Sequence, residues 1–171
     1  MRRVKLFIAT SLDGYIARAD GRVDWLFTDD DYGYAAFYES VDTVVMGRRT
    51  YDDVLGFGPY PYADKTGYVF SHSRPAASND PVAFVSESPA ALVARLRESA
   101  GRDIWLVGGA GLTAAFLDED LIDDFIVSSH PIILGSGIPL FPRQGRELRL
   151  ALSGVTTFES GLVQLRYARR P

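Results

Sequence analysis

A strand that ends in glycines and leads into a helix constrains this chain more than any other feature. Residues 104–117, IWLVGGAGLTAAFL, open with four apolar residues, the length and type expected of a buried central strand. Gly108, Gly109 and Gly111 allow a tight turn, and residues 112–117 have the composition of a short helix. Such a turn presents free backbone N–H groups and the positive end of a helix dipole. It indicates either a phosphate or pyrophosphate site, or a tight turn that binds nothing.

Apolar runs that alternate with helical patterns predict a single α/β domain over residues 1–171. Strands are expected at 4–10, 41–46, 67–71, 82–85, 104–107 and 121–129. Helices are expected after Asp29–Asp31, at 48–55, from Ser88-Pro89 to Gly101, and at 112–117. Alternating residues in 148–158 and 162–167 predict an antiparallel C-terminal hairpin. The central sheet should therefore be mixed.

Composition excludes several classes of function. A net charge of −4 argues against a nucleic-acid surface, which needs a basic face. With no cysteine and two histidines, we expect neither a disulfide framework nor a metal site. The first apolar run is too short for a signal peptide, and no segment approaches the length of a membrane span. A cytoplasmic protein that does not bind membranes is the expectation.

Two more strands end in residues suited to phosphate. Residues 47–50, GRRT, place a glycine, two guanidiniums and a hydroxyl at a helix start, although two surface arginines would look the same. Residues 71–74, SHSR, could hold the 2′-phosphate that distinguishes NADP from NAD, or could form an ordinary polar turn. Ligands of α/β sheets bind outside the carboxyl ends of the strands. Three such ends together favour a dinucleotide site.

The segments SLDGYIA, VVMGRRTYDDV, VFSHS, LVGGAGLTAAFL and HPIILGSGIPLF resemble, in this order, the dihydrofolate reductase-like superfamily. More narrowly, they are similar to the C-terminal reductase domain of bifunctional riboflavin-biosynthesis proteins, here expected to stand alone. The resemblance covers nearly the whole chain. It implies a three-layer α/β fold, with a mixed central sheet, an antiparallel C-terminal hairpin and helices on both faces. It also implies a homodimer and a reductase that uses NADPH.

The resemblance assigns the cofactor residues. Ala9 and Ile16 would face the nicotinamide end. The phosphates and adenosine would contact Gly47, Arg48, Arg49 and Thr50. The adenine ribose phosphate would lie near Ser71 and Arg74. The pyrophosphate turn would comprise Gly108, Gly109, Ala110, Gly111, Leu112 and Thr113.

The substrate side is less defined. Trp25 and Asp13 would border the substrate, and Ser128 closes the strand predicted beside it. Asp13 precedes Gly14, so it is either a turn residue or a group that handles a proton beside the nicotinamide. A dihydrofolate reductase carries one pocket carboxylate on its first helix. Counting back from Gly47 points to Asp31 for that acid, whereas counting forward from Trp25 points to Asp30.

Asp13 and Asp31 are thus the candidate catalytic residues, and Trp25 and Ser128 the candidate substrate contacts. Helix capping and solvated charge would also explain all of Asp29–Asp31. His130 is expected to be a core or strand-end histidine rather than a base.

The leading hypothesis is a reductase of a small heterocycle or imine, similar to the riboflavin-pathway 5-amino-6-(5-phosphoribosylamino)uracil reductase. One alternative is a non-catalytic nucleotide-binding module, and another is a dihydrofolate reductase proper. A third is a structural protein that uses the apolar loop 56–62, GFGPYPY, to bind a partner.

Overall fold

The computed structural model describes residues 1–73, 81–142 and 147–170. The strands are β1 (Val4–Ser11), β2 (Tyr15–Ala17), β3 (Val41–Gly47), β4 (Thr66–Phe70), β5 (Val82–Val85), β6 (Asp103–Gly108), β7 (Asp124–His130), β8 (Ile138–Pro139), β9 (Leu150–Thr157) and β10 (Val163–Arg169). The helices are α1 (Tyr34–Ser40), α2 (Arg48–Gly56), α3 (Pro89–Glu98) and α4 (Ala110–Asp118).

Eight strands form one sheet in the order β5-β4-β3-β6-β1-β7-β10-β9. The pairs from β5 through β7 are parallel, as expected where a helix or a long crossover separates two strands. The C-terminal hairpin adds β10 antiparallel to β7 and β9 antiparallel to β10. The short strands β2 and β8 pair separately. This arrangement confirms the predicted mixed sheet and C-terminal hairpin.

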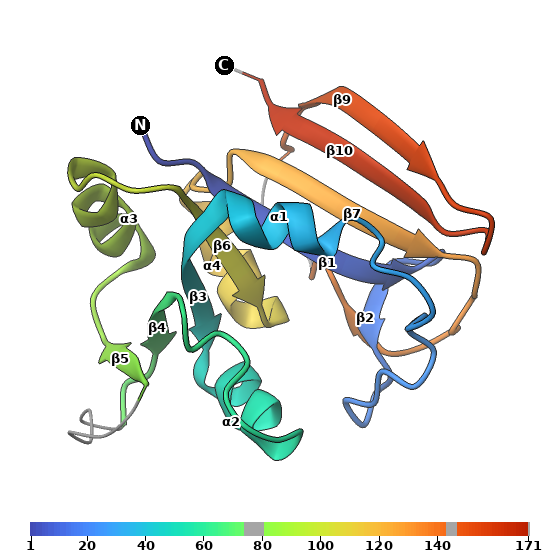
Figure 1. The fold of residues 1–171 in the computed structure, drawn as a ribbon, viewed down its shortest axis with the longest axis horizontal. Coiled ribbons are helices and arrows are strands. Elements are labelled where there is room, and N and C mark those ends of the chain that lie inside the picture. The colour runs from blue at the N-terminus through green and yellow to red at the C-terminus, as the bar shows by residue number, and fades with distance from the viewer. Residues whose placement is uncertain (74–80, 143–146, 171) are drawn as a thin grey trace.

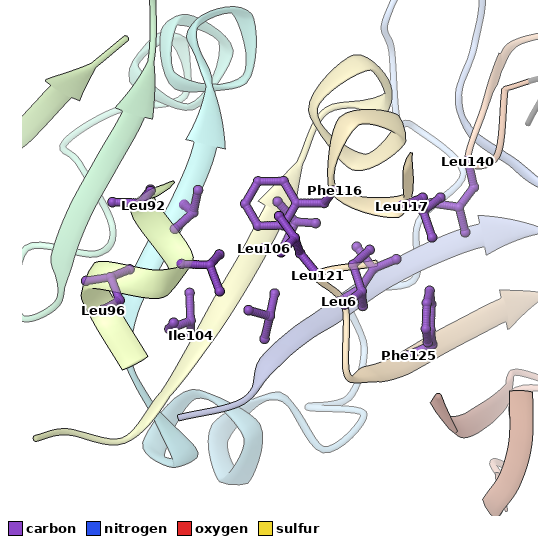
Figure 2. Close-up of a cluster of buried hydrophobic side chains, with 14 residues drawn as sticks. Leu6, Leu92, Leu96, Ile104, Leu106, Phe116, Leu117, Leu121, Phe125 and Leu140 are labelled. Atoms are coloured by element: carbon purple, nitrogen blue, oxygen red, sulfur yellow. The ribbon is translucent and has the colours of Figure 1, made fainter. Parts of the chain in front are cut away.

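Helices cover both faces of the sheet, because alternate strand residues supply two apolar clusters. On one face, α3 and α4 bury Leu92, Leu96 and Phe116 against Leu6 and Leu106 of the strands (Figure 2). On the other face, α1 and α2 bury Phe37 and Tyr51 against a second cluster that includes Val44, Met46 and Trp105. Figure 1 shows α1 in front of the sheet and α4 behind it. The three-layer architecture is therefore confirmed.

Several element boundaries differ from the predictions for local reasons. Helix α4 begins at Ala110 rather than at residue 112, because Gly109 already adopts the extended N-cap conformation. Helix α3 starts at the predicted Ser88 cap but ends at Glu98, and Ser99 then donates to the carbonyl of Leu96. Strand β7 begins at Asp124, since the preceding residues close the end of α4.

None of the helices in the described part of the chain is long and apolar enough to cross a membrane.

Candidate active site

The carboxyl ends of the parallel strands meet at one edge of the sheet, and two helices begin there. Helix α2 follows β3 directly, with Gly47 as its N-cap, and α4 follows β6 with Gly109 as its N-cap. No side chain of the described residues caps either helix. The first N–H groups of a helix have no partner inside the helix. Because β3 and β6 are neighbours in the sheet, two sets of free donors lie side by side.

The two helix-starting turns fit closely against each other. A Cβ atom on Gly109 would lie only 3.1 Å from Thr50 Oγ1, and one on Gly47 would lie 3.9 Å from Leu112 Cβ. Gly108 has a φ of +121°, which favours glycine, and its peptide bond to Gly109 is cis. By contrast, a Cβ on Gly111 would meet no atom within 4 Å. The turn is closed toward α2 and open at Gly111.

Thr113 leaves a buried hydroxyl beneath this turn. The residue is 0% exposed, and its Oγ1 has no hydrogen-bond partner in the described residues. A Cβ on Gly108 would lie 4.0 Å from this oxygen. Buried polar atoms nearly always have a partner, so we expect a partner for this hydroxyl from outside the described residues.

The two arginines of the GRRT segment diverge. Arg48 forms a 2.8 Å ion pair with Asp52, and its Cζ lies 5.6 Å from the ring centroid of Phe84 on β5. Arg49 is exposed and has no ion-pair partner among the residues that the structure describes. Its Nη2 lies 3.8 Å from where a Cβ on Gly21 would be. Arg48 therefore faces the β4–β5 side, and Arg49 faces the loop after β2.

The predicted 2′-phosphate residues are only partly described. Ser71 follows β4 at the same edge of the sheet, and its N–H donates to the carbonyl of Val85 at 3.0 Å. Its Oγ accepts from the N–H of Ser73 at 3.4 Å. Arg74 lies outside the described residues. On the nicotinamide side, Ala9 lies near the end of β1, and Ile16 in β2 packs against the apolar cluster under α3 and α4.

Asp13 is exposed and holds a neighbouring loop. Its carboxylate accepts from the N–H groups of Leu134 at 3.1 Å and Gly135 at 2.8 Å. A hydrogen bond from the Ser11 hydroxyl, with these two, lowers the pKa of Asp13 below its ordinary value. These contacts favour the interpretation of a turn residue, and a role in proton transfer stays a prediction.

The acidic residues before α1 make local bonds. Asp31 Oδ1 accepts from the N–H of Ala35 at 3.0 Å, in the first turn of α1, whose N-cap residue is Gly33. Asp30 accepts from the N–H of Asp31, and Asp29 accepts from the Tyr32 hydroxyl. All three carboxylates are exposed. Asp31 as a catalytic acid stays a prediction.

Trp25, a predicted substrate contact, packs against His130. Trp25 is 7% exposed, its ring lies 5.2 Å from the His130 ring at an angle of 87°, and its Nε1 has no partner in the described residues. His130 Nε2 accepts from the N–H of Phe27 at 3.3 Å, and Nδ1 contacts the carbonyl of Ser128 at 3.3 Å. Burial lowers the pKa of His130. This neutral, buried histidine agrees with the expectation from its position.

Gln164 is a buried residue bonded to the predicted substrate contact Ser128, and the sequence did not single it out. Strand register places Ala9, Ser128 and Gln164 in one row across β1, β7 and β10. Gln164 is 1% exposed, and its Nε2 donates to Ser128 Oγ at 3.2 Å and to the Tyr32 carbonyl at 3.1 Å. In the sequence it is one polar residue in an alternating strand, and no local signal marks it as buried.

The chain is similar to known proteins along nearly its full length. Residues 2–164 match the family model of the RibD C-terminal domain. The uncharacterized protein YwjB of Bacillus subtilis is 46% identical over 98% of both chains. The riboflavin biosynthesis protein RibD of Corynebacterium ammoniagenes is 29% identical over 79% of this chain and 44% of that protein. A putative riboflavin biosynthesis protein from Shewanella superposes with a TM-score of 0.89 and 33% identity, over 99% of each chain.

Proposed function

Because this chain belongs to the RibD C-terminal domain family, a family of reductase domains, we propose that it is an NADPH-dependent reductase. It would transfer a hydride to a C=N or C=O carbon of a small heterocycle, similar to 5-amino-6-(5-phosphoribosylamino)uracil. The observation that carries the proposal is the pair of uncapped helix starts, α2 and α4, at the carboxyl edge of the sheet. Two such starts side by side suit the two phosphates of a dinucleotide.

The residues present fit this cofactor. The N–H groups at 110–112 would bind the pyrophosphate at the open side of the turn, with the Thr50 and Thr113 hydroxyls beside it. Arg48 and Ser71, on the β4–β5 side, would contact the adenosine end. NADPH, when bound, supplies the hydride. The chain contributes orientation, which is the largest part of the rate gain in such reactions.

The substrate would lie on the side of Ala9, Trp25 and Ser128. Within the described residues, Asp123 is the one buried carboxylate, and it lies at the opposite edge of the sheet. A pterin-binding acid like that of dihydrofolate reductases therefore has no buried counterpart in the described part of this site. This favours a pyrimidine-like heterocycle, protonated from ordered water, over dihydrofolate.

Calorimetric titration with NADPH tests the cofactor half of the proposal. A wild-type protein that binds no NADPH overturns it. Gly111→Ala sharpens the test, because an added methyl meets no protein atom within 4 Å but would project toward a bound pyrophosphate. We expect unchanged thermal stability and at least tenfold weaker NADPH binding. Gly56→Ala, also in open space but at the far end of α2, is the matched control and should bind NADPH normally.

A substrate screen separates an enzyme from a nucleotide-binding module. Oxidation of NADPH would be followed with 5-amino-6-(5-phosphoribosylamino)uracil, dihydrofolate and simple imines. Turnover of the pyrimidine supports the proposal. Tight NADPH binding with no turnover of any of the three would favour the non-catalytic module.

A homodimer is a separate proposal, supported by the edge strand β9. Ser153 is unpaired in the β9–β10 ladder, which brings Leu152 and Val155 onto the same face of the strand. Their side chains are 57% and 53% exposed. Exposed apolar side chains on an edge strand favour pairing with another chain. Light scattering should give twice the chain mass, and Leu152→Glu should return the protein to a monomer. A wild-type protein with the mass of one chain would refute the homodimer.

A further inference from the structure

We propose that Gln164 fixes the Ser128 hydroxyl as a hydrogen-bond donor toward the substrate, so that the substrate must present an acceptor there. The acceptor would be a ring carbonyl oxygen or an unprotonated ring nitrogen. The inference rests on the proposed reductase function and concerns its substrate side.

The orientation of the Gln164 amide is determined by its partners. Arg166 Nε and Nη2 lie 3.2 Å and 3.0 Å from Gln164 Oε1, and an arginine can only donate. On the other side, Nε2 lies 3.1 Å from the carbonyl oxygen of Tyr32, which can only accept. Exchanging the oxygen and nitrogen of the amide would break these contacts. The NH₂ group therefore faces Tyr32 and Ser128.

This orientation fixes the role of the Ser128 hydroxyl. The second hydrogen of Gln164 Nε2 points to Ser128 Oγ at 3.2 Å, so this oxygen accepts. Its own proton is then left to donate, and no acceptor for it occurs in the described part of the chain. Ser128 is only 5% exposed. A buried donor without an acceptor is costly unless a ligand supplies one.

Ser128 lies on the same face of the sheet as the residues assigned to the reaction. Ser128 is paired in register with Ala9, the residue expected at the nicotinamide end. Two residues further along β7, the ring of His130 packs against the ring of Trp25. The carbonyl of Ser128 is itself held by His130 Nδ1 at 3.3 Å, so the backbone at this position is also fixed. A flat ring in front of Ala9 would meet this hydroxyl with its edge.

The arrangement selects substrates by hydrogen-bond polarity. A pyrimidine edge with a carbonyl oxygen complements the Ser128 proton. An edge with an amino group would oppose one donor with another and leave both unpaired, which enzymes reject strongly. Gln164 is then a positioning residue, because it acts through Ser128 and need not touch the substrate.

Four variants test the inference, with 5-amino-6-(5-phosphoribosylamino)uracil as the probe. We expect Ser128→Ala to raise KM about tenfold or more, while Ser128→Thr, which keeps the hydroxyl, stays within about threefold of wild type. Gln164→Glu is nearly isosteric and can pair with Arg166, but its carboxylate only accepts. The Ser128 proton should turn toward it, so the KM rise should match that of Ser128→Ala. The double variant Ser128→Ala, Gln164→Glu should then add nothing further.

The outcomes separate this inference from the proposed function. NADPH affinity, measured by calorimetry, should be the same in all four variants, and a wild type that binds no NADPH would overturn the proposed function itself. Equal KM values for Ser128→Thr and Ser128→Ala would overturn the role of the Ser128 hydroxyl. Fully additive losses in the double variant would overturn the role of Gln164. If the wild type binds NADPH but neither reduces nor binds the pyrimidine, the inference that the substrate presents an acceptor to Ser128 falls, while cofactor binding stands.

Discussion

The two edges of the central sheet are built in opposite ways. At the amino-terminal edge, charged side chains meet partners: Arg2 with Asp42, Lys5 with Asp103 at 2.8 Å, and Arg97 with Asp123 at 2.7 Å. At the carboxyl-terminal edge, two helix starts lack side-chain caps, and the buried Thr113 hydroxyl has no partner in the described residues.

This difference separates stability from binding in space. Asp123 at the amino-terminal edge accepts from both Arg97 and the N–H of Val4, so little hydrogen-bonding capacity is left for a ligand. Capacity left unused at the other edge costs the free protein stability but is available to a cofactor. Substitutions at the amino-terminal edge should change the free energy of unfolding and leave NADPH affinity unchanged. At the carboxyl-terminal edge, a substitution that removes an unpaired polar group should raise the free energy of unfolding and lower NADPH affinity.

The largest expected effect is at the amino-terminal edge. Arg2 is 7% exposed and contacts Asp42, the Thr43 hydroxyl and the Arg102 carbonyl. We expect Arg2→Ala to lower the free energy of unfolding by about 2–4 kcal/mol, because it leaves these groups without their partner. Urea denaturation measures the loss. Arg22→Ala, which removes an exposed pair with Asp20, is the control and should cause no measurable change. A loss of NADPH affinity in folded Arg2→Ala would contradict the assignment of stability and binding to opposite edges of the sheet.

The second prediction concerns pH at the carboxyl-terminal edge. Burial lowers the pKa of His130 below its ordinary value of 6.5, so the unfolded chain takes up a proton there first. The contribution of neutral His130 is complete above pH 6.5 and is lost as the pH falls below it, by at most about 1.4 kcal/mol per pH unit. Unfolding free energies between pH 8 and 5 should show this slope.

Two variants isolate this histidine. His130→Asn should have a lower unfolding free energy at pH 8, and this free energy should not change between pH 8 and 5. His72→Asn, at an exposed position, should keep the pH dependence of the wild type. A wild-type stability that does not change between pH 6.5 and 5 would contradict the assignment.

Thr113 gives a smaller effect that distinguishes the edges most directly. Thr113→Val removes a buried hydroxyl without a partner in the described residues and keeps the side-chain shape. We expect the free protein to gain about 1 kcal/mol of unfolding free energy, and NADPH to bind about tenfold more weakly. Denaturation and calorimetry measure the two changes. A variant that gains stability with unchanged NADPH affinity would show that the hydroxyl does not serve the cofactor.

The smallest effects are expected at the two candidate catalytic acids. Asn at position 31 can still accept from the N–H of Ala35, and Asn at position 13 can keep one of the two bonds from Leu134 and Gly135. We therefore expect Asp13→Asn and Asp31→Asn to change the turnover of the pyrimidine by less than about tenfold. Loss of a general acid costs about 10²–10⁴-fold. A loss of that size in either variant would restore that residue as the proton donor.

The sequence predicted the strand ends and helix starts better than the contacts between distant segments, for a physical reason. Strand-end glycines and helix starts such as Ser88 and Gly109 act over a few residues, so local patterns indicate them. The contacts of Asp13 with Gly135, and of Gln164 with Ser128, join distant segments through strand register. Neither a charge nor a turn signal marks Gln164. The local rules therefore predicted the layers of the fold and the phosphate-suited turns, but not the network behind Ser128.

The position of β10 has a consequence for the order in which this protein can assemble during synthesis. Strand β10 is the last element of the chain, yet it lies between β7 and β9 in the sheet (Figure 1). While the chain is growing, β9 leaves the ribosome with no neighbouring strand to join. The glycine turns at 47 and 108 can form earlier, but the hydroxyl of Ser128 acquires its fixed direction only when Gln164 arrives. If the proposed function holds, the turns that would bind the nucleotide can therefore form before the contacts that would select the substrate.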